Sequence, residues 1–266
     1  MYKQYGTIEA NNESFWSDHW KTQNTNQQMS SAKNSELIPI FKKYLPKHGK
    51  ILEAGCGQGA YVNALKELGY DIEGIDFDSK TIENSKKIFP ELPIKVGDVF
   101  KTNFPNNYLH AYISLGVIEH YESNFENPIK EAGRILRQDG LIMISVPYFN
   151  IFRKIYLPIR NLFVKKQQKK FYQYLFTKNE IEKLIKNNGF SIVGKEFYGK
   201  TKTLLSLPII GNIIRKMYNY SRETSSYKTT SNTKHISKIA GIAKTLLNFL
   251  PNSVFAHMIM IIAKKQ

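Results

Sequence analysis

The sequence has only one cysteine, Cys56, so no disulfide can form within the chain. A single free cysteine is typical of proteins from a reducing compartment. The sequence also lacks any apolar run of the ~20 residues that a membrane-spanning helix needs. Its first ten residues show no basic and apolar signal pattern. These absences exclude a disulfide scaffold and predict a cytoplasmic protein.

Acidic residues are scarce in the second half of the chain. Residues 1–148 hold 16 Lys and Arg against 18 Asp and Glu, whereas residues 149–266 hold 22 against 4. This imbalance favours an anionic partner for the second half, such as a membrane surface, an acidic substrate or nucleic acid. The alternative is a lysine-rich surface that is merely solvated.

The histidines show no spacing to Asp, Glu or Cys that is typical of a metal site. We therefore expect no metal.

Strand and helix patterns alternate along the first half. The predicted strands are residues 50–53, 71–75, 93–96, 108–115 and 140–146. The predicted helices are residues 61–68, 79–88 (capped by Ser79) and 126–136. This alternation predicts an α/β fold with a doubly wound, mostly parallel sheet.

A glycine-rich turn follows the first predicted strand. Gly55, Gly57 and Gly59 let the backbone approach a ligand, and the helix that begins near Tyr61 points its N–H groups toward it. The glycines alone also fit a dinucleotide fingerprint. Glu53 argues against that ligand, because a carboxylate at the end of the strand repels a pyrophosphate but attracts the cationic groups of S-adenosylmethionine. The alternative is a glutamate that merely faces solvent.

Two more acids follow the next two predicted strands. Asp76 stands where an acid binds both ribose hydroxyls in this architecture, and Phe77 can lay its ring on an adenine. Asp98 can accept a hydrogen bond from the adenine amino group, while the backbone of Val99 contacts the ring nitrogens. Each acid alone is typical of a turn. Three of them after three successive strands predict an S-adenosylmethionine site.

Four segments of the chain resemble class I S-adenosylmethionine-dependent methyltransferases, especially the small-molecule group that includes quinone-biosynthesis enzymes. These segments are Glu53–Gly59, Asp76, Gly97–Val99 and Ser114–His120. The resemblance implies a Rossmann-like sheet of seven strands whose last strand is antiparallel. It also implies that the glycine turn binds the methionyl part of the cofactor, and that Leu115 and Val117 line the cofactor cleft.

We divide the chain into three parts: a helical cap (residues 1–46), an S-adenosylmethionine-binding core (47–148) and a sheet completion with two basic insertions that form a substrate lid (149–266). In the cap we expect a helix over 14–21, on which Trp16 and Trp20 share a face, a loop over 22–35 and a helix over 36–45. In the last part we expect a capped helix over 177–187 and strands over 190–197 and 254–263.

Methyl transfer from a sulfonium is an in-line displacement, for which a protein supplies alignment and sometimes a base. His120 follows the fourth predicted strand and is the candidate catalytic base. The alternative is that His120 only shapes the cofactor loop. Its neighbour Glu119 is an equally good candidate for an acid at a helix N-terminus.

Apolar and basic residues interleave over 151–157 and 209–220, as in segments that lie in a membrane interface. We therefore expect a small-molecule, glycan or lipid-linked acceptor, methylated on oxygen or carbon, with possible peripheral contact to an anionic membrane. A lid that completes the core is the alternative for these segments.

The alternative function is a nucleic-acid-binding or RNA-directed protein, although Ser114–Val117 does not match the Asn-Pro-Pro-Tyr type of base-methylating enzymes. A NAD-dependent dehydrogenase comes third.

Overall fold

The structure is a computed structural model that describes residues 1–6, 13–163, 170–200 and 251–266. The chain forms two compact units. The first comprises Met1–Phe149, Val164–Glu196 and Ile259–Gln266, and the second comprises Asn150–Phe163 and Phe197–Met258. A seven-stranded sheet dominates the first unit.

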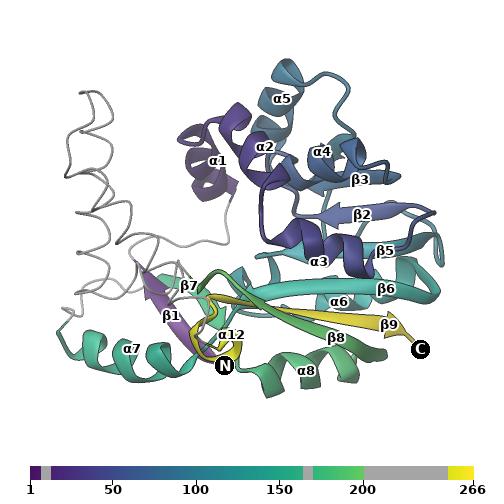
Figure 1. Cartoon of the computed structure of the whole chain (residues 1–266). Coiled ribbons are helices and arrows are strands. Elements are labelled where there is room, and N and C mark those ends of the chain that lie inside the picture. The colour runs from purple at the N-terminus through teal and green to yellow at the C-terminus, as the bar shows by residue number, and fades with distance from the viewer. Residues whose placement is uncertain (7–12, 164–169, 201–250) are drawn as a thin grey trace, which may run out of the picture. The chain divides into compact units, whose positions relative to one another are not determined.

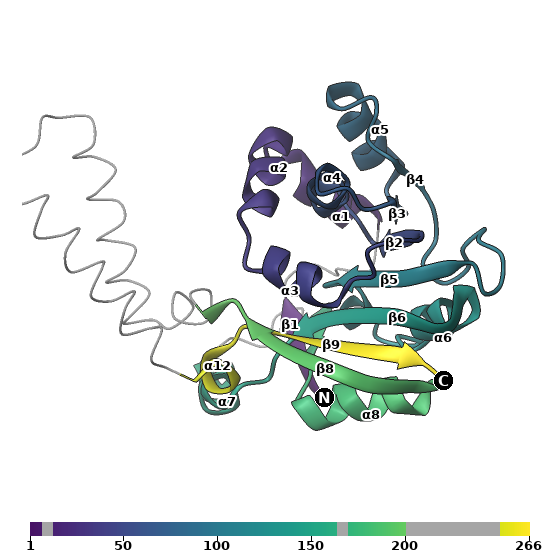
Figure 2. The same ribbon diagram turned by 45° about the vertical axis from the view of Figure 1, so that its right-hand side comes forward.

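The strand order of this sheet is β4-β3-β2-β5-β6-β9-β8, and Figures 1 and 2 both show β9 between β6 and β8. The strands are β2 (Ile51–Ala54), β3 (Ile72–Asp76), β4 (Ile94–Val96), β5 (Leu109–Leu115), β6 (Leu136–Pro147), β8 (Phe190–Tyr198) and β9 (Met258–Lys265). Parallel pairs join β4 to β3, β3 to β2, β2 to β5 and β5 to β6. The arrowhead of β9 lies at the opposite end from that of β2 (Figure 1). The predicted α/β fold, with a mostly parallel seven-stranded sheet, is confirmed.

The central strands are buried and mostly apolar, although β2 also carries Glu53. All four residues of β2 are buried, as are five of the seven in β5. A parallel strand covered on both faces needs such a continuous run rather than an alternating one. Five helices correspond to helices that the sequence predicted: α3 (Leu37–Tyr44), α4 (Ala60–Glu67), α5 (Ser79–Ile88), α6 (Asn127–Ile135) and α8 (Lys178–Asn187).

Two helix starts test the predicted caps. Thr177 and Glu180 form the expected capping box at the start of α8. At α5 the cap is Asp78 rather than Ser79, because the Asp78 carboxylate accepts a hydrogen bond from the backbone N–H of Lys80. The prediction of Ser79 as cap was wrong by one residue.

The N-terminal region is more ordered than its polar sequence indicates. α1 (Glu13–Lys21) forms where the aromatic cluster predicted a helix, but α2 (Thr25–Lys33) occupies the segment predicted as a loop. Asn24 caps α2, and the helix buries Thr25 and Met29 against the rest of the unit. Tertiary burial therefore overrides a weak local propensity here.

A second sheet was not predicted at all. β1 (Tyr2–Gly6) pairs antiparallel with β7 (Lys170–Leu175). The two strands are far apart in sequence, so neither shows a hairpin signal.

The C-terminal strand is shorter at its start than predicted. α12 (Asn252–Phe255) occupies the beginning of the predicted strand 254–263, and β9 begins only at Met258. The predicted basic insertion over 209–220 lies outside the described residues. No helix in the described ranges is long and apolar enough to cross a membrane.

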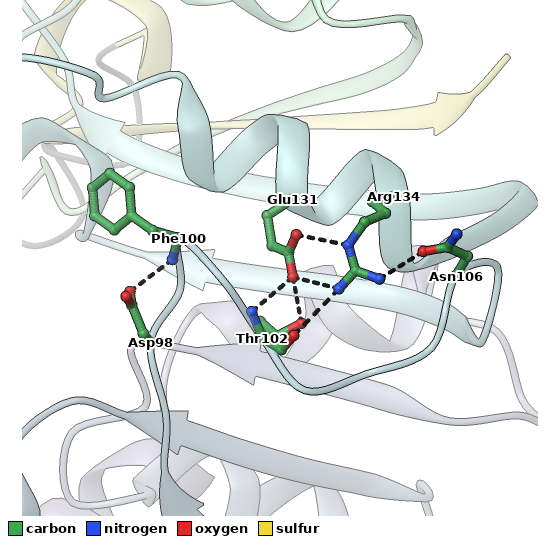
Figure 3. A network of polar contacts seen from close by, with 6 residues as sticks. All are labelled: Asp98, Phe100, Thr102, Asn106, Glu131 and Arg134. Atoms are coloured by element: carbon green, nitrogen blue, oxygen red, sulfur yellow. Dashed lines mark hydrogen bonds and ion pairs between the residues drawn. The ribbon is translucent and has the colours of Figure 1, made fainter.

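The loop after β4 is fastened to α6 by a polar network (Figure 3). The Glu131 carboxylate accepts hydrogen bonds from the backbone N–H and the hydroxyl of Thr102, at 2.7 and 2.6 Å. Arg134 donates to the same carboxylate and to the side-chain oxygen of Asn106. Charge-assisted bonds of this kind hold the loop that carries Val99 in one position.

Candidate functional site

A cavity lies at the carboxyl ends of β2, β3 and β5, where ligands bind in open α/β sheets. Nine residues that the sequence predicted for the site line this cavity: Glu53, Gly55, Tyr61, Asp76, Phe77, Val99, Leu115, Val117 and His120. Three others, Gly57, Gly59 and Asp98, do not line it. The structure thus brings together residues from four separate stretches of the chain.

Gly57 and Gly59 shape the turn instead of lining the cavity. Both have a left-handed backbone, with φ of 51° and 78°. A Cβ on Gly57 would stand 2.4 Å from the indole of Trp20, and one on Gly59 would stand 2.9 Å from Leu92 and Ile94. The turn therefore needs glycine for its backbone conformation and for the close approach of its neighbours.

Replacing Gly57 by alanine should lower the free energy of unfolding by about 3 kcal/mol, because left-handed strain and overpacking against Trp20 add together. Gly69→Ala is the matched control, since Gly69 has φ of 87° but nothing within 4 Å of the added Cβ. It should cost only about 1 kcal/mol. Urea unfolding of both variants checks this, and equal costs would contradict the role of Trp20.

Asp76 ties the end of β3 to the glycine turn. Its buried carboxylate, only 5% exposed, accepts hydrogen bonds from the backbone N–H groups of Gly57 (2.8 Å) and Asp78 (3.1 Å). Burial raises the pKa of Asp76 above its ordinary value, while these two N–H groups oppose the rise. The acid is therefore held in one orientation at the cavity wall.

Asp78 is a structural residue that the sequence did not single out for this region. It is fully buried and accepts hydrogen bonds from Ser17 of α1 (2.7 Å) and from Thr81 of α5. These bonds hold α1, with its two tryptophans, beside the cavity. Its only signal in the sequence is the cap position before α5.

Glu53 is not at the surface, so the interpretation as a solvent-facing glutamate was wrong. Its side chain is 3% exposed, and burial raises its pKa to about 8. Its Oε2 atom is buried and has no hydrogen-bond partner among the described residues. A buried acceptor without a hydrogen bond destabilises the folded protein unless a ligand donates one to it. A cationic donor such as the methionine ammonium of S-adenosylmethionine fits this position.

His120 lies in the short 3-10 helix η1 (Ile118–His120) and is 7% exposed. Its Nδ1 is 2.9 Å from the backbone carbonyl oxygen of Tyr172 in β7. Because a carbonyl only accepts, Nδ1 carries the proton and Nε2 is left as an acceptor. Burial lowers the pKa of His120 to about 4, so the ring is neutral at pH 7.

Glu119, next to His120, is a buried carboxyl like Glu53. Burial raises its pKa to about 8, and its Oε2 lacks a hydrogen-bond partner within the described part of the chain. It sits in the first turn of η1, as the helix-terminus interpretation expected. It does not line the cavity.

An aromatic wall completes the cavity, and the sequence did not assign it to the site. Trp16 and Trp20 of α1 line the cavity together with Tyr121, and the Trp16 ring lies 4.9 Å from His120. The two indoles are stacked at 6.4 Å. Their four-residue spacing was the sequence signal, but only the fold shows that this face meets the cavity. No Lys or Arg of the described ranges lines the cavity.

Asp98 is exposed, and its Oδ1 accepts a hydrogen bond from the backbone N–H of Phe100 at 2.8 Å (Figure 3). This is a turn contact. Its assignment to the adenine stays a prediction.

Comparison with known proteins supports the same cofactor. Residues 52–144 match the family model described as a methyltransferase domain. A probable S-adenosylmethionine-dependent methyltransferase of Mycolicibacterium smegmatis is 27% identical over 97 residues, which are 36% of this chain and 37% of that protein. The ubiquinone biosynthesis O-methyltransferase of Pelagibacter ubique is 26% identical over 104 residues, or 37% of this chain and 42% of that protein.

Other relatives differ in their named acceptors. Some carry names of RNA- or protein-directed methyltransferases. The chain spans less than half the length of each of these curated relatives.

The whole described fold also has a solved counterpart. A S-adenosylmethionine-dependent methyltransferase structure from Archaeoglobus fulgidus aligns with 96% of this chain and 100% of its own, at 16% identity and a TM-score of 0.58. At that identity the likeness concerns the fold alone. Sheet order, cavity position and the family match over residues 52–144 agree, and this part of the chain is similar to the methyltransferase domain of class I S-adenosylmethionine-dependent enzymes.

Proposed function

We propose that the chain transfers a methyl group from S-adenosylmethionine to a small-molecule, glycan or lipid-linked acceptor. The observation that carries this proposal is the buried Glu53 carboxyl with its unpartnered Oε2 at the end of β2. When bound, S-adenosylmethionine supplies an electrophilic methyl group. Glu53 would hold its ammonium, Asp76 its ribose, and Phe77 with Val99 its adenine.

His120 is the residue that would accept the proton of the acceptor. Its Nδ1–H is engaged by Tyr172, so Nε2 is the nitrogen available to a hydroxyl. A pKa of about 4 makes His120 a weak base in the resting protein, but it also keeps the ring unprotonated at neutral pH. The acceptor hydroxyl becomes much more acidic as its bond to the methyl carbon forms, so a neutral imidazole suffices at that stage.

The cavity wall supports an acceptor that is uncharged where it reacts. Trp16, Trp20 and Tyr121 offer ring faces and edges, and no cationic side chain of the described ranges is present to bind a phosphate there. A planar, hydroxylated group suits this surface best. Transfer to oxygen is therefore our preferred reaction, with transfer to carbon as the alternative.

An RNA-directed protein is the second candidate, supported by the basic second half and by the names of some relatives. The absence of Lys and Arg from the described lining of the cavity weighs against it. RNA binding that falls steeply with salt would favour this candidate.

Calorimetry with S-adenosylmethionine and with NAD tests the cofactor, and only the first should bind. Methyl transfer is tested by feeding the labelled cofactor and an extract of cells that lack the protein. Labelled product should form with the wild type and fall at least about 100-fold with His120→Ala, because general-base catalysis typically supplies that much. Unchanged labelling by the variant would leave His120 only a role in shaping the loop. Binding of NAD alone would overturn the proposed function.

A further inference from the structure

The helix α7 (Ile151–Phe163), in the second unit, presents an exposed row of three isoleucines. Ile151, Ile155 and Ile159 are 55%, 62% and 50% exposed. Their four-residue spacing places them along one face of the helix. Exposed isoleucines are ordinary when scattered, but an aligned row of three forms a continuous apolar stripe.

Phe152, which lies beside the row, and Arg153, which lies opposite it, contact residues of the second unit. Phe152 packs on Phe255 of α12 with ring centroids 4.6 Å apart. Arg153 donates to the backbone carbonyl of His257 at 3.0 Å, and Leu157 is buried. The isoleucine row is therefore not the packing face of this helix in the described structure.

The stretch of sequence that carries the row has only basic charged residues. Lys154 is exposed beside Ile155, and no acidic residue stands between Asp139 and Glu180 in the sequence. Four lysines follow the helix within seven residues, at positions 165, 166, 169 and 170. An amphipathic helix with apolar residues on one face and basic residues around it suits the interface of an anionic bilayer.

We propose that the isoleucine row of α7 docks on an anionic lipid bilayer, with the isoleucines among the acyl chains and Lys154 at the headgroups. The charged backbone of a nucleic acid has no apolar surface on which three isoleucine side chains could be buried. A second copy of this chain carries the same excess of positive charge, so its approach is opposed by like-charge repulsion. This proposal is independent of the acceptor's identity.

Co-sedimentation of the full chain with vesicles tests the proposal. We expect binding to phosphatidylcholine vesicles that contain phosphatidylglycerol, and much less binding to phosphatidylcholine alone. Ile155→Asp should weaken binding to the anionic vesicles at least about 10-fold, because a charge would enter the apolar layer. Lys154→Gln should weaken it about fivefold, and only for anionic vesicles.

The matched control is Ile88→Asp, which changes an isoleucine of similar exposure, 49%, at the end of α5. It should bind vesicles like the wild type. Equal binding of wild type to neutral and anionic vesicles, or no effect of Ile155→Asp, would overturn the proposal. A lower melting temperature for Ile155→Asp would also overturn it, because it would show that other residues of the chain cover the isoleucine row. A dimer of the wild type that Ile155→Asp dissociates would overturn it too, because a second copy would then occupy the row. Titration of each variant with S-adenosylmethionine tests the cofactor site separately.

Discussion

Replacing Asp76 by asparagine should lower the affinity for S-adenosylmethionine at least about 100-fold. The carboxylate accepts two backbone N–H groups and is the acid predicted to bind the ribose hydroxyls. Asparagine keeps one acceptor oxygen but turns an NH₂ group toward a second donor. A buried N–H is then unsatisfied, and the predicted charged hydrogen bonds to the ribose, each worth about 1.5–3 kcal/mol, would be lost. Calorimetry measures the affinity directly.

The matched control is Asp71→Asn, just before the other end of the same strand. Asp71 has a side chain that is 64% exposed and pairs with Lys50 at 3.6 Å. Surface pairs of this kind contribute little, so this variant should bind the cofactor normally. Circular dichroism must show that Asp76→Asn is folded. Wild-type affinity in that variant would remove Asp76 from the site.

The protein without cofactor should become less stable as the pH rises from about 4.5 to about 8. Glu53 and Glu119 ionise near their ordinary pKa in the unfolded chain, but burial raises the pKa of each to about 8 in the folded protein. The folded state therefore holds more protons across this window, and stability is lost as the pH rises through it. The loss is up to about 4 kcal/mol for each group. Urea unfolding at a series of pH values measures it.

Binding of S-adenosylmethionine should offset the loss of stability that comes from ionising Glu53, but not the loss that comes from ionising Glu119. A cationic ligand favours the ionised carboxylate, so Glu53 should release a proton on binding. Affinity should then rise between pH 6 and 7.5 by up to about tenfold per unit, because neutral Glu53 must first ionise. Calorimetry in buffers of different ionisation enthalpy counts the protons released.

The matched pair for this prediction is Glu53→Gln and Glu119→Gln. The first variant should abolish both the proton release and the pH dependence of affinity. The second should flatten only the stability profile, since Glu119 does not line the cavity. Proton release that persists in Glu53→Gln would assign the effect to another group.

The parallel sheet and the cofactor end of the site could be predicted from the sequence because their signals are local. Strands such as β2 and β5 are mostly apolar, and the glycines and acids stand at strand ends that a parallel sheet brings to one edge. The helix α2 and the β1–β7 pair could not be predicted in this way. Their formation depends on burial and on pairing with segments remote in sequence.

The sequence by itself determined the sheet type, the glycine turn and the positions of Glu53 and Asp76 at the ends of successive strands. Only the tertiary structure decided how each group behaves. It buried Glu53 and left Oε2 unpartnered, and it set the tautomer of His120 through a carbonyl of β7. It also brought α1 and its tryptophans to the cavity. Burial and long-range hydrogen bonds come from neighbours that the chain supplies from elsewhere, and no local pattern encodes them.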